Sequence, residues 1–557
     1  MSRLVIVSNR VADLRAATQT GGLAVGLADA VKKRGGVWFG WNGEREGETG
    51  GDLQVETIGK VERVAAPLSP EDVSDYYFGY ANSVLWPLFH YRLDLVDYRP
   101  SFFASYSRVN ETFARQLLPF LEPDDLVWVH DYHLIPLASH LRRLGCRQRI
   151  GFFLHIPFPP PDLLNAAPNH AELVDALLDY DVVGFQTHAD AGNLKHYLGE
   201  HVSAVQVAPN RFRLGERSVL IDRFPIGIDA ASVAKMAREA DDEVQIDLMR
   251  RRVLGRRQII GVDRLDYSKG LPERLKAFGQ LLAQHPELEK SVTFLQIAPP
   301  TREEVDAYAD IRVELETLAG SINGRFADFN WTPIRYIHRS VSRRKLAPLF
   351  RGSQVGFVTP LRDGMNLVAK EYVAAQDPED PGVLVLSKFA GAAEEMRQAL
   401  IVNPYDIDDM ARRLHRALTM PLKERRRRHE ALLDHVNRHD ATAWLDAFLA
   451  AMRATEDRRT FERVPMGGAP VTLLLPNGGE TAAGLVDLSL GGAAVETGVT
   501  APPGTSIGLR FAGIEGVAQA RVARCEGGRL GCALRQDPLT RALVAQVLDG
   551  RGAKAAA

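Results

Sequence analysis

The sequence lacks the features that mark exported or membrane-spanning proteins. Its 557 residues include three cysteines, Cys146, Cys525 and Cys532, which are too few for a disulfide framework and fit no zinc spacing. No apolar run approaches the roughly 20 residues of a membrane span, and Leu4–Val7 is too short for a signal peptide. We therefore expect reduced thiols and a cytoplasmic protein that binds no membrane.

The sequence also lacks an excess of charge of either sign. It contains 68 Lys and Arg residues against 70 Asp and Glu residues, a formal net charge of -2. Without a basic field, non-specific nucleic-acid binding is not expected, and small molecules are the expected partners. We interpret the basic run Arg425–Arg428 as the solvated face of a helix. The composition is also compatible with a homo-oligomer.

The length and the apolar patterns predict three domains. A chain of 557 residues is too long for one hydrophobic core. Up to residue 453, apolar runs such as Ile259–Val262 alternate with helical patterns, as in parallel sheets covered on both faces. After a polar linker at 454–458 the apolar period changes to two. We predict two Rossmann-like α/β domains, residues 1–230 and 231–453, and a small β-barrel, residues 459–550.

Residues 261–270 follow an apolar strand of the second domain and open a helix. Such a loop lies at the carboxyl end of a parallel sheet, where backbone amides and charged side chains meet phosphorylated ligands. Arg264 and Lys269 can both reach one diphosphate and neutralise charge on a leaving group. The alternative is that the two residues form ordinary surface ion pairs.

Residues 361–371 repeat this arrangement of strand, loop and helix. Amides around Asn366 and Leu367 can bind phosphate at the start of the helix. Glu371 can accept hydrogen bonds from ribose hydroxyls, or it can simply face the positive end of the helix dipole. Together the two segments indicate a phosphorylated ligand.

The first domain offers polar groups at the same edge of its sheet. His155 enters a stiff proline-rich loop at 156–161, which would hold the imidazole at the rim of the sheet, although a structural histidine is the alternative. Residues 130–133 end the preceding strand and offer partners for sugar hydroxyls; His130 and Asp131 point apart, which disfavours a metal site. The Gly21–Gly22 pair lets backbone amides approach a ligand, but such pairs also form ordinary turns.

These segments resemble the trehalose-6-phosphate synthases, a family of retaining glycosyltransferases with the GT-B fold. The resemblance covers about residues 1–453. It is carried by Ser8–Arg10, Gly21–Leu23, Trp38–Trp41, Val129–Leu134, Phe153–Pro159, Arg264–Gly270 and Leu361–Leu367. It implies that the first domain binds glucose 6-phosphate and the second a nucleotide-glucose, normally UDP-glucose. The last helix before the linker is expected to cross back to the first domain.

The resemblance also implies a role for each matching side chain. The catalytic set would be Arg264 and Lys269 on the donor diphosphate, with His155 and Asp363 on the transferred glucose. Further donor contacts would come from Gly22, Asn366, Leu367 and Glu371. The acceptor would be held by Arg10, Trp41, Tyr77, Trp86, Asp131 and Arg302. None of these positions departs from the family pattern.

The mechanism expected of this family is retaining, because donor and product are both α-linked. No carboxylate is placed as a covalent nucleophile, which favours a front-face route in which the leaving phosphate accepts the acceptor proton. Two cations on the diphosphate make a metal unnecessary, and no cofactor is expected. Asp406–Asp408 would suit a metal site of another glycosyltransferase class, but we interpret Asp406 as the cap of a helix at 407–420.

The appended module carries two halves of a second motif, RxxxR at Arg459 and Arg463 and DxSxxG at Asp487, Ser489 and Gly492. Together they resemble the PilZ domain, a small β-barrel that binds cyclic di-GMP. The resemblance implies that the arginines grasp phosphates and guanine, while Asp487 and Ser489 complete the guanine contacts. Each half alone is common, and an arginine run after a linker is usually solvated.

Three functional hypotheses follow. The first is a trehalose-6-phosphate synthase regulated by cyclic di-GMP. The second is a sister transferase with another phosphorylated acceptor, such as glycerol 3-phosphate; Tyr77, Trp86 and Arg302 favour a sugar phosphate instead. The third is a non-catalytic scaffold that senses nucleotide sugar, and the intact donor set argues against it.

Overall fold

The computed structural model describes residues 2–11, 35–45, 52–202, 204–214, 217–239, 255–301, 306–454, 464–476, 478–502, 504–535 and 537–555. Four candidate residues lie outside the described residues: Gly22, Arg302, Arg459 and Arg463. The chain forms two compact units. The first extends to Arg453 apart from residues 205–209, and the second comprises those five residues and the chain from Ala454 onward.

The N-terminal half of the first unit is built on a mostly parallel sheet. Its strands run in the order β3-β4-β2-β1-β5-β6-β7-β10-β9, and β3 and β9 are antiparallel to their neighbours. The strands of this half are β1 Leu4–Arg10, β2 Gly36–Arg45, β3 Gln54–Ile58, β4 Val61–Leu68, β5 Leu126–His130, β6 Arg149–Phe153, β7 Val182–Phe185, β9 Arg211–Leu214 and β10 Arg217–Arg223, whereas β8 Val205–Ala208 belongs to the second unit. Val5 and Val7 of β1 join one core cluster and Leu4 and Ile6 another, so both faces of the sheet are covered.

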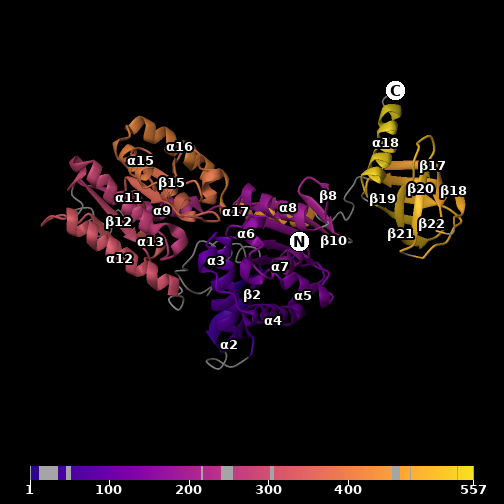
Figure 1. Cartoon of the computed structure of the whole chain (residues 1–557), viewed down its shortest axis with the longest axis horizontal. Helices are drawn as coiled ribbons and strands as arrows, with labels where there is room; N and C mark the ends of the chain where they lie inside the picture. The colour runs from indigo at the N-terminus through magenta and orange to yellow at the C-terminus, as the bar shows by residue number, and fades with distance from the viewer. Residues whose placement is uncertain are drawn as a thin grey trace. The chain divides into compact units, whose positions relative to one another are not determined.

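Helices of this half connect the strands and cover the sheet (Figure 1). They are α2 Pro70–Asp72, η1 Val73–Leu85, α3 Trp86–Phe89, η2 Leu93–Leu95, α4 Pro100–Leu117, η3 Leu118–Phe120, η4 Tyr132–Leu134, α5 Leu137–Arg143, α6 Pro161–Leu164, α7 His170–Leu177 and α8 His188–His201. Proline stands within the first two positions of α2, α3, α4 and α6, where its missing N–H and fixed φ suit a helix start.

The C-terminal half holds a six-stranded parallel sheet in the order β13-β12-β11-β14-β15-β16. Its strands are β11 Arg257–Val262, β12 Val292–Ile297, β13 Ile334–Ile337, β14 Val355–Val358, β15 Val383–Ser387 and β16 Leu400–Val402. Its helices are α9 Ala230–Glu239, η6 Tyr267–Lys269, α11 Leu271–Gln284, η7 Pro286–Leu288, α12 Asp306–Phe326, α13 Arg343–Arg351, α14 Leu367–Ala375, η8 Gly391–Glu394, α15 Ile407–Thr419, α16 Leu422–Arg438 and α17 Ala441–Ala454. The order places β11 and β14 side by side, so the loops that follow them share one edge.

The last helix of the first unit, α17, returns to the N-terminal sheet (Figure 1). Phe448 is fully buried and stacks on Trp128 of β5, with ring centroids 4.6 Å apart. A Cβ on Gly151 or on Gly184 would lie 2.7 Å from this phenyl ring, so the bare glycines of β6 and β7 make room for it. Glycine in these two strands therefore serves the approach of a helix that is distant in sequence.

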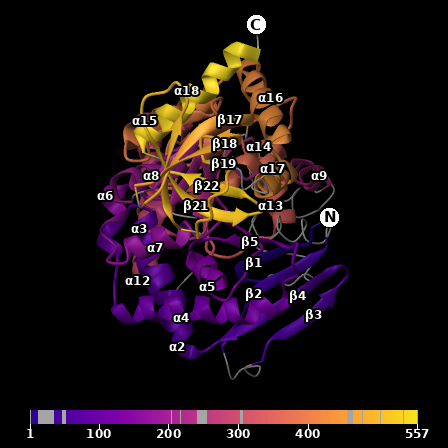
Figure 2. The same ribbon diagram turned by 90° about the vertical axis from the view of Figure 1, so that its right-hand side faces the viewer.

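The second unit contains a closed six-stranded antiparallel barrel, whose yellow strands face the viewer in Figure 2. The order around it is β17-β18-β19-β22-β21-β20. The elements are β17 Val464–Leu474, β18 Glu480–Ser489, β19 Gly492–Glu496, β20 Ser506–Phe511, β21 Ala518–Glu526, β22 Arg529–Leu534 and the helix α18 Pro538–Ala555. Leu473, Leu488, Val495 and Leu530 point into its core and are fully buried.

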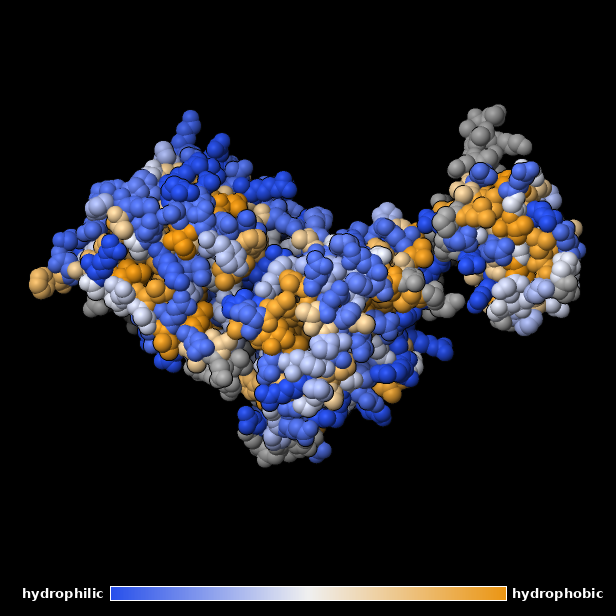
Figure 3. Space-filling model, in the orientation of Figure 1, coloured by the Kyte–Doolittle hydropathy of each residue, from blue (hydrophilic) through white to orange (hydrophobic). Residues whose placement is uncertain are grey.

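The two sheets and the barrel confirm the predicted fold class. Asp406 does cap α15, because its carboxylate accepts a hydrogen bond from the Asp409 amide at 2.8 Å. The interpretation of Arg425–Arg428 was only half right. The surface over α15 and α16 is predominantly hydrophilic (Figure 3), but Arg425 and Arg428 turn inward to the Pro381 and Gln398 carbonyls. Among the helices that the structure describes, none has the length and apolar content needed to cross a membrane.

The first prediction concerns α17. We expect Phe448→Ala to destabilise the first unit by about 3–5 kcal/mol, because it removes a buried ring and leaves a hole between two glycines and Trp128. Urea unfolding followed by tryptophan fluorescence measures the change. Thr442→Ala, at an exposed position of the same helix, is the control and should change the stability by less than about 0.5 kcal/mol. Equal midpoints for the two variants would contradict the packing role of Phe448.

Candidate active site

The loop between β11 and α11, residues 263–270, carries Arg264 and Lys269, and we call it the lysine loop. Asp266 caps its short helix η6, because its Oδ1 accepts hydrogen bonds from the Ser268 amide and hydroxyl at 2.9 and 2.8 Å. Gly270 has φ +62°, and a Cβ there would lie 2.3 Å from the Thr359 carbonyl oxygen. A side chain at position 270 would therefore push the loop away from the end of β14.

A buried arginine of α11 holds the lysine loop in place. Arg274 of α11 has no exposed surface and pairs with Asp263 at 2.8 Å. It also donates to the Lys269 carbonyl at 3.3 Å and to the Thr359 hydroxyl at 3.1 Å. Breaking such a buried pair leaves an uncompensated charge, which is strongly destabilising. Arg274 thus sets the backbone position from which Lys269 extends.

The loop between β14 and α14, residues 361–366, carries Asp363, and we call it the aspartate loop. It lies beside the lysine loop, since the Leu361 amide donates to the Ser268 carbonyl at 2.8 Å. Asn366 has φ +78°, and its side-chain oxygen accepts from the Ala369 amide at 3.2 Å, which caps α14. The cap turns the backbone amides at the start of α14 toward the shared edge of the sheet.

Lys269 and Asp363 meet at this edge although they stand 94 positions apart. The Lys269 ammonium donates to Asp363 Oδ2 at 2.6 Å, and the two side chains are only 10% and 13% exposed. The Asn366 amide donates to the same Oδ2 at 3.0 Å. Burial alone would raise the pKa of Asp363, but Lys269 and Asn366 together hold that pKa below its ordinary value. The carboxylate is therefore ionised at neutral pH.

Two further donor candidates, Arg264 and Glu371, have partners within the protein. The exposed Arg264 guanidinium lies over the Trp86 ring, with Cζ 5.4 Å from the centroid, which joins a donor candidate to an acceptor candidate. Glu371 is paired with Arg343 of α13 at 2.9 Å. Burial raises the pKa of Glu371, and Arg343 opposes that shift. Glu371 thus has a charged partner that neither of the sequence interpretations included.

Three of the predicted acceptor residues, one arginine and two aromatic residues, form one cluster. Arg10, at the end of β1, lies with Cζ 4.6 Å from the centroid of the Trp41 ring. Trp41 is buried, and its centroid lies 5.3 Å from that of Tyr77. Because Arg10 itself is exposed, its guanidinium can receive a phosphate group without moving a core side chain.

Tyr77 and Trp86 owe their positions to an unusual helix. Residues 73–85 form a π-helix, η1, which runs directly into α3 at Trp86. The Tyr76 hydroxyl donates to Asn9 at 2.8 Å, and the Asn82 side chain donates to the Tyr77 carbonyl at 2.7 Å. π-Helical segments are rare, and the short π-bulges that interrupt α-helices frequently lie at functional sites.

His155 and Asp131 lie where β6 and β5 end. His155 contacts His130 through their ring nitrogens at 3.1 Å, and burial lowers the pKa of His155 to about 3. Asp131 has φ +76° and accepts from the His155 amide at 3.2 Å. A non-glycine residue in this conformation is strained, as is common at functional sites. His130 and His133 are buried, so of the segment 130–133 only Asp131 remains as the partly exposed charged group for a sugar.

The two halves of the first unit touch at the site. A Cβ on Gly364 of the aspartate loop would lie 2.1 Å from the His155 carbonyl oxygen and 3.0 Å from the Ile156 Cα. A Cβ on Gly391 would lie 2.9 Å from the Thr187 methyl group. The residues predicted to bind the transferred glucose, His155 and Asp363, therefore approach one another from opposite halves.

Sequence reasoning missed several residues that support the site. Asp263 and Arg274 were not selected, although an arginine on the otherwise apolar face of α11 was a usable signal. His90 was missed too. It is buried, its Nδ1 lies 2.7 Å from the Trp86 carbonyl, and burial lowers its pKa to about 4. A lone histidine in an aromatic segment gives no comparable signal.

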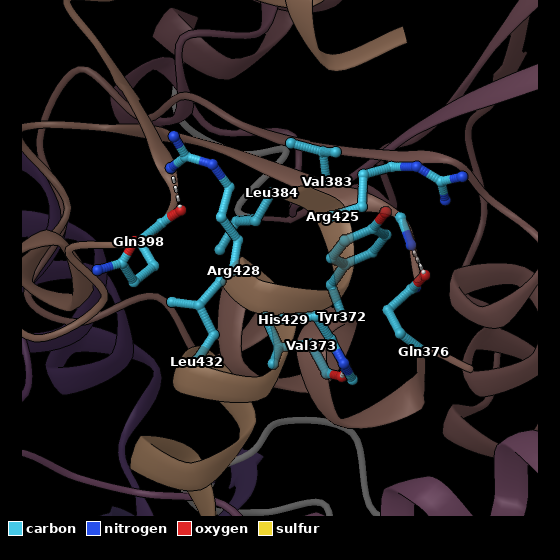
Figure 4. A pocket seen from close by; sticks show the side chains of 11 residues that line it. Tyr372, Val373, Gln376, Val383, Leu384, Gln398, Arg425, Arg428, His429 and Leu432 are labelled. Atoms are coloured by element: carbon cyan, nitrogen blue, oxygen red, sulfur yellow. Dashed lines mark hydrogen bonds between the residues drawn. The ribbon is translucent and has the colours of Figure 1, made fainter. Parts of the chain in front are cut away.

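A small cavity between α14 and α16 is not part of this site (Figure 4). Its volume is about 10 Å³, room for about one water molecule. Tyr372, Gln376, Arg425 and His429 are among its lining residues, and none of the candidate site residues lines it. The Arg425 and Arg428 side chains drawn there donate hydrogen bonds to neighbouring backbone carbonyls. The cavity is therefore a packing gap where α16 contacts the rest of the domain.

The described part of the PilZ-like motif lies at the turn from β18 to β19. The Ser489 hydroxyl is buried and accepts from the Gly492 amide at 3.1 Å. Asp487 is half-buried and pairs in register with Ala494 across the two strands. Ser489 and Gly492 thus have a structural role in closing this turn, beside any role toward a ligand.

Comparisons with known proteins match both parts of the chain. The family described as "Glycosyltransferase family 20" matches residues 5–454, and the family described as "PilZ domain" matches residues 457–549. Trehalose-6-phosphate synthase of Klebsiella pneumoniae is 46% identical over 467 residues, which are 83% of this chain and 98% of that protein.

Solved structures of trehalose-phosphate synthases also match this chain. The α,α-trehalose-phosphate synthase (UDP-forming) of Burkholderia vietnamiensis is 50% identical, with a TM-score of 0.79 over 82% of this chain and 97% of that one. The Burkholderia xenovorans enzyme in complex with glucose-6-phosphate is 49% identical. Its TM-score is 0.78, and the match covers 81% of this chain and 100% of that one. An E. coli structure bound with UDP-2-fluoro glucose is 46% identical. Its TM-score is 0.78, and the match covers 81% of this chain and 99% of that one.

The second prediction concerns His155. Its folded pKa of about 3 lies below the ordinary 6.5, so between these values the unfolded chain binds a proton that the folded chain does not. The stability that neutral His155 contributes is complete above pH 6.5 and is lost as the pH falls toward 3. From pH 6.5 to pH 5 the loss is about 1.6 kcal/mol, because the unfolded histidine is already half protonated at pH 6.5.

We expect His155→Gln to remove about this amount from the stability difference between pH 6.5 and pH 5, measured by urea unfolding at both values. His188→Gln, which changes an exposed histidine of α8, is the control and should leave the difference as in the wild type. An unchanged difference in His155→Gln would contradict the lowered pKa.

Proposed function

The chain belongs to glycosyltransferase family 20, and from this premise we propose that it moves glucose from UDP-glucose to glucose 6-phosphate, giving trehalose 6-phosphate. The matches confirm the predicted family and fold class, and the chain is a glycosyltransferase of the trehalose-6-phosphate synthase type. The observation that carries the proposal is the contact of Lys269 with Asp363 at the sheet edge where the two halves meet. Incubation with UDP-glucose and glucose 6-phosphate, followed by product analysis, tests it.

The donor would lie across the lysine and aspartate loops. Arg264 and Lys269 would hold the diphosphate together with the amides of Asn366 and Leu367, while Asp363 and His155 would bind hydroxyls of the transferred glucose. Glu371 and Gly22 complete the proposed donor set. Because Lys269 and Asp363 form an ion pair, the donor would have to share or replace their contact.

The acceptor would bind in the N-terminal half. Arg10 offers an exposed guanidinium for the phosphate, and Trp41 and Tyr77 form the wall beside it. The remaining members of the proposed set are Trp86, Asp131 and Arg302. Trp86 contacts Arg264, so this acceptor would lie next to the departing diphosphate.

In the proposed reaction the bond from C1 of glucose to the diphosphate oxygen breaks, and a bond from C1 to the acceptor oxygen forms on the same face. The acceptor hydroxyl gives its proton to the leaving phosphate oxygen, and UDP departs. Arg264 and Lys269 stabilise the charge that grows on the diphosphate. Neutral His155 can bond to the sugar without adding a positive charge beside C1, and the approach of the two halves excludes water.

For the second unit we propose that cyclic di-GMP binds through Arg459, Arg463, Asp487, Ser489 and Gly492 and changes the rate of glucose transfer. The match to the PilZ family supports this site. We also place the protein in the cytoplasm, consistent with three free cysteines.

The third prediction tests the donor site. We expect Lys269→Ala to lower turnover a hundredfold or more, because it removes a cation that is needed most when the diphosphate departs. Lys276→Ala is a matched control: Lys276 lies on α11 just beyond the loop, is 43% exposed and pairs with Glu314. It should keep wild-type turnover. Near-normal turnover in folded Lys269→Ala would refute the assignment of Lys269.

The fourth prediction tests the PilZ unit. Calorimetry should show cyclic di-GMP binding to the wild type and none to Arg463→Ala, because the arginine supplies charge-assisted bonds to phosphate and guanine. Arg510→Ala, which removes an exposed ion pair with Glu480 on the barrel, is the control and should bind normally. Equal binding by all three proteins would refute the site, and binding without any change in turnover would refute the regulatory role.

A further inference from the structure

Two arginine–tyrosine contacts join the halves of the first unit in a reciprocal way. Arg362 of the aspartate loop donates to the Tyr91 hydroxyl at 2.6 Å, and its Cζ lies 4.1 Å from the Tyr91 ring centroid. Arg92, the next residue, lies with Cζ 5.5 Å from the centroid of Tyr267 in the lysine loop. Each half therefore supplies one arginine and one tyrosine, and consecutive residues of the N-terminal half contact both loops.

The tyrosine is held in a conformation that its residue type disfavours. Tyr91 has φ +64°, in the left-handed region that usually calls for glycine or asparagine. The turn is closed by bonds from the Tyr91 amide to the Leu88 carbonyl at 3.1 Å and from the Arg92 amide to the Pro87 carbonyl at 2.9 Å. Glycine would satisfy this backbone, so a tyrosine at the position points to a use for its side chain.

The partners of the two contacts flank the central ion pair. Tyr267 stands two positions before Lys269, and Arg362 immediately precedes Asp363. The Arg362 amide also donates to the Ser268 carbonyl at 3.3 Å, which ties the two loops together beside these contacts. A displacement of residues 91–92 therefore acts on both loops at once.

On its other side the turn is attached to the acceptor residues. His90 packs against Trp86, with centroids 4.2 Å apart, and contacts its carbonyl. Trp86 begins α3, which continues the π-helix that carries Tyr77. A bidentate pair with Asp94, at 2.9 and 2.8 Å, fixes the Arg92 guanidinium. The segment 90–92, which we call the bridging turn, thus connects acceptor residues to both loops.

We propose that the bridging turn couples the two substrate sites. Acceptor binding at Tyr77 and Trp86 orders the turn, and Tyr91 and Arg92 then hold the lysine and aspartate loops in the geometry that binds the donor. The four residues of the reciprocal contacts are positioning residues. The identity of the ligands rests on the proposed function, but the mechanical link between the turn and the loops does not.

Calorimetry with UDP, which permits no turnover, measures the coupling. Wild-type protein should bind UDP at least fivefold more tightly when glucose 6-phosphate is saturating, within the usual range for coupled sites. In Tyr91→Phe and Arg362→Lys the ratio should fall toward one. The double variant should be no worse than either single one, because both changes remove the same contact. Arg325→Ala, which removes an arginine–aromatic contact within α12, is the control and should keep the wild-type ratio.

Additive losses in the double variant would mean that Arg362 acts on the nucleotide independently of Tyr91, and would overturn the proposal. A ratio of one in wild-type protein that binds both ligands would overturn it as well. Failure of the wild type to bind either ligand would refute the proposed function instead, and the mechanical link is then decided by an experiment without ligands.

That experiment is amide hydrogen exchange of the full chain without ligand. These contacts tie the turn to both loops, so Tyr91→Phe combined with Arg362→Lys should speed exchange in residues 88–92 and in both loops by about tenfold. Exchange in β12 and β15 should stay as in the wild type. Unchanged loop protection in the variant would refute the link, and faster exchange in the turn alone would refute it equally.

Discussion

The close approach of Gly364 to the backbone of His155 is the constraint on which the site depends. A single Cβ at this position would lie 2.1 Å from a carbonyl oxygen, so only glycine lets the carboxyl ends of the two sheets come this near. Without that approach Asp363 and His155, the residues proposed to bind the transferred glucose, would lie too far apart for that role. Glycine permits a similarly close approach at Gly270, where the lysine loop passes the end of β14. It does so again at Gly151 and Gly184, against which helix α17 packs.

Buried charge, balanced in pairs, keeps the loops in place once the halves have met. Asp263 is compensated by Arg274 of α11, and Asp363 of the aspartate loop is compensated by Lys269. The Asn366 side chain donates to the Asp263 and Asp363 carboxylates, at 3.3 and 3.0 Å, and so joins the two ion pairs. A single unpaired member would carry the full cost of a buried charge, which explains why the loops form one network and not two independent ones.

The sequence was enough for the sheets, the family and the loops, because apolar runs and long motifs report on them directly. The apolar pattern is weak at β19 and β22, whose cores of Gly492–Val495 and Leu530–Ala533 are short and made largely of small residues. The sequence missed the π-helix η1, since no spacing rule distinguishes it from an α-helix, and the pairing of Glu371 with Arg343. Pairings between distant segments such as Tyr91 and Arg362 depend on how the halves meet, and local patterns do not encode that.

The contact between Lys269 and Asp363 joins the two groups that we propose to hold opposite ends of the donor. Lys269 is proposed to hold the diphosphate and Asp363 the glucose, so the two ends of one donor would be bound by side chains that also pair with each other. A diphosphate alone would draw Lys269 away and leave Asp363 buried without its cation. A complete nucleotide-glucose would supply hydroxyl donors to Asp363 as it withdraws the lysine. With these proposed roles the ion pair would favour the intact donor over the bare nucleotide, because only the intact donor would leave no buried charge unpaired.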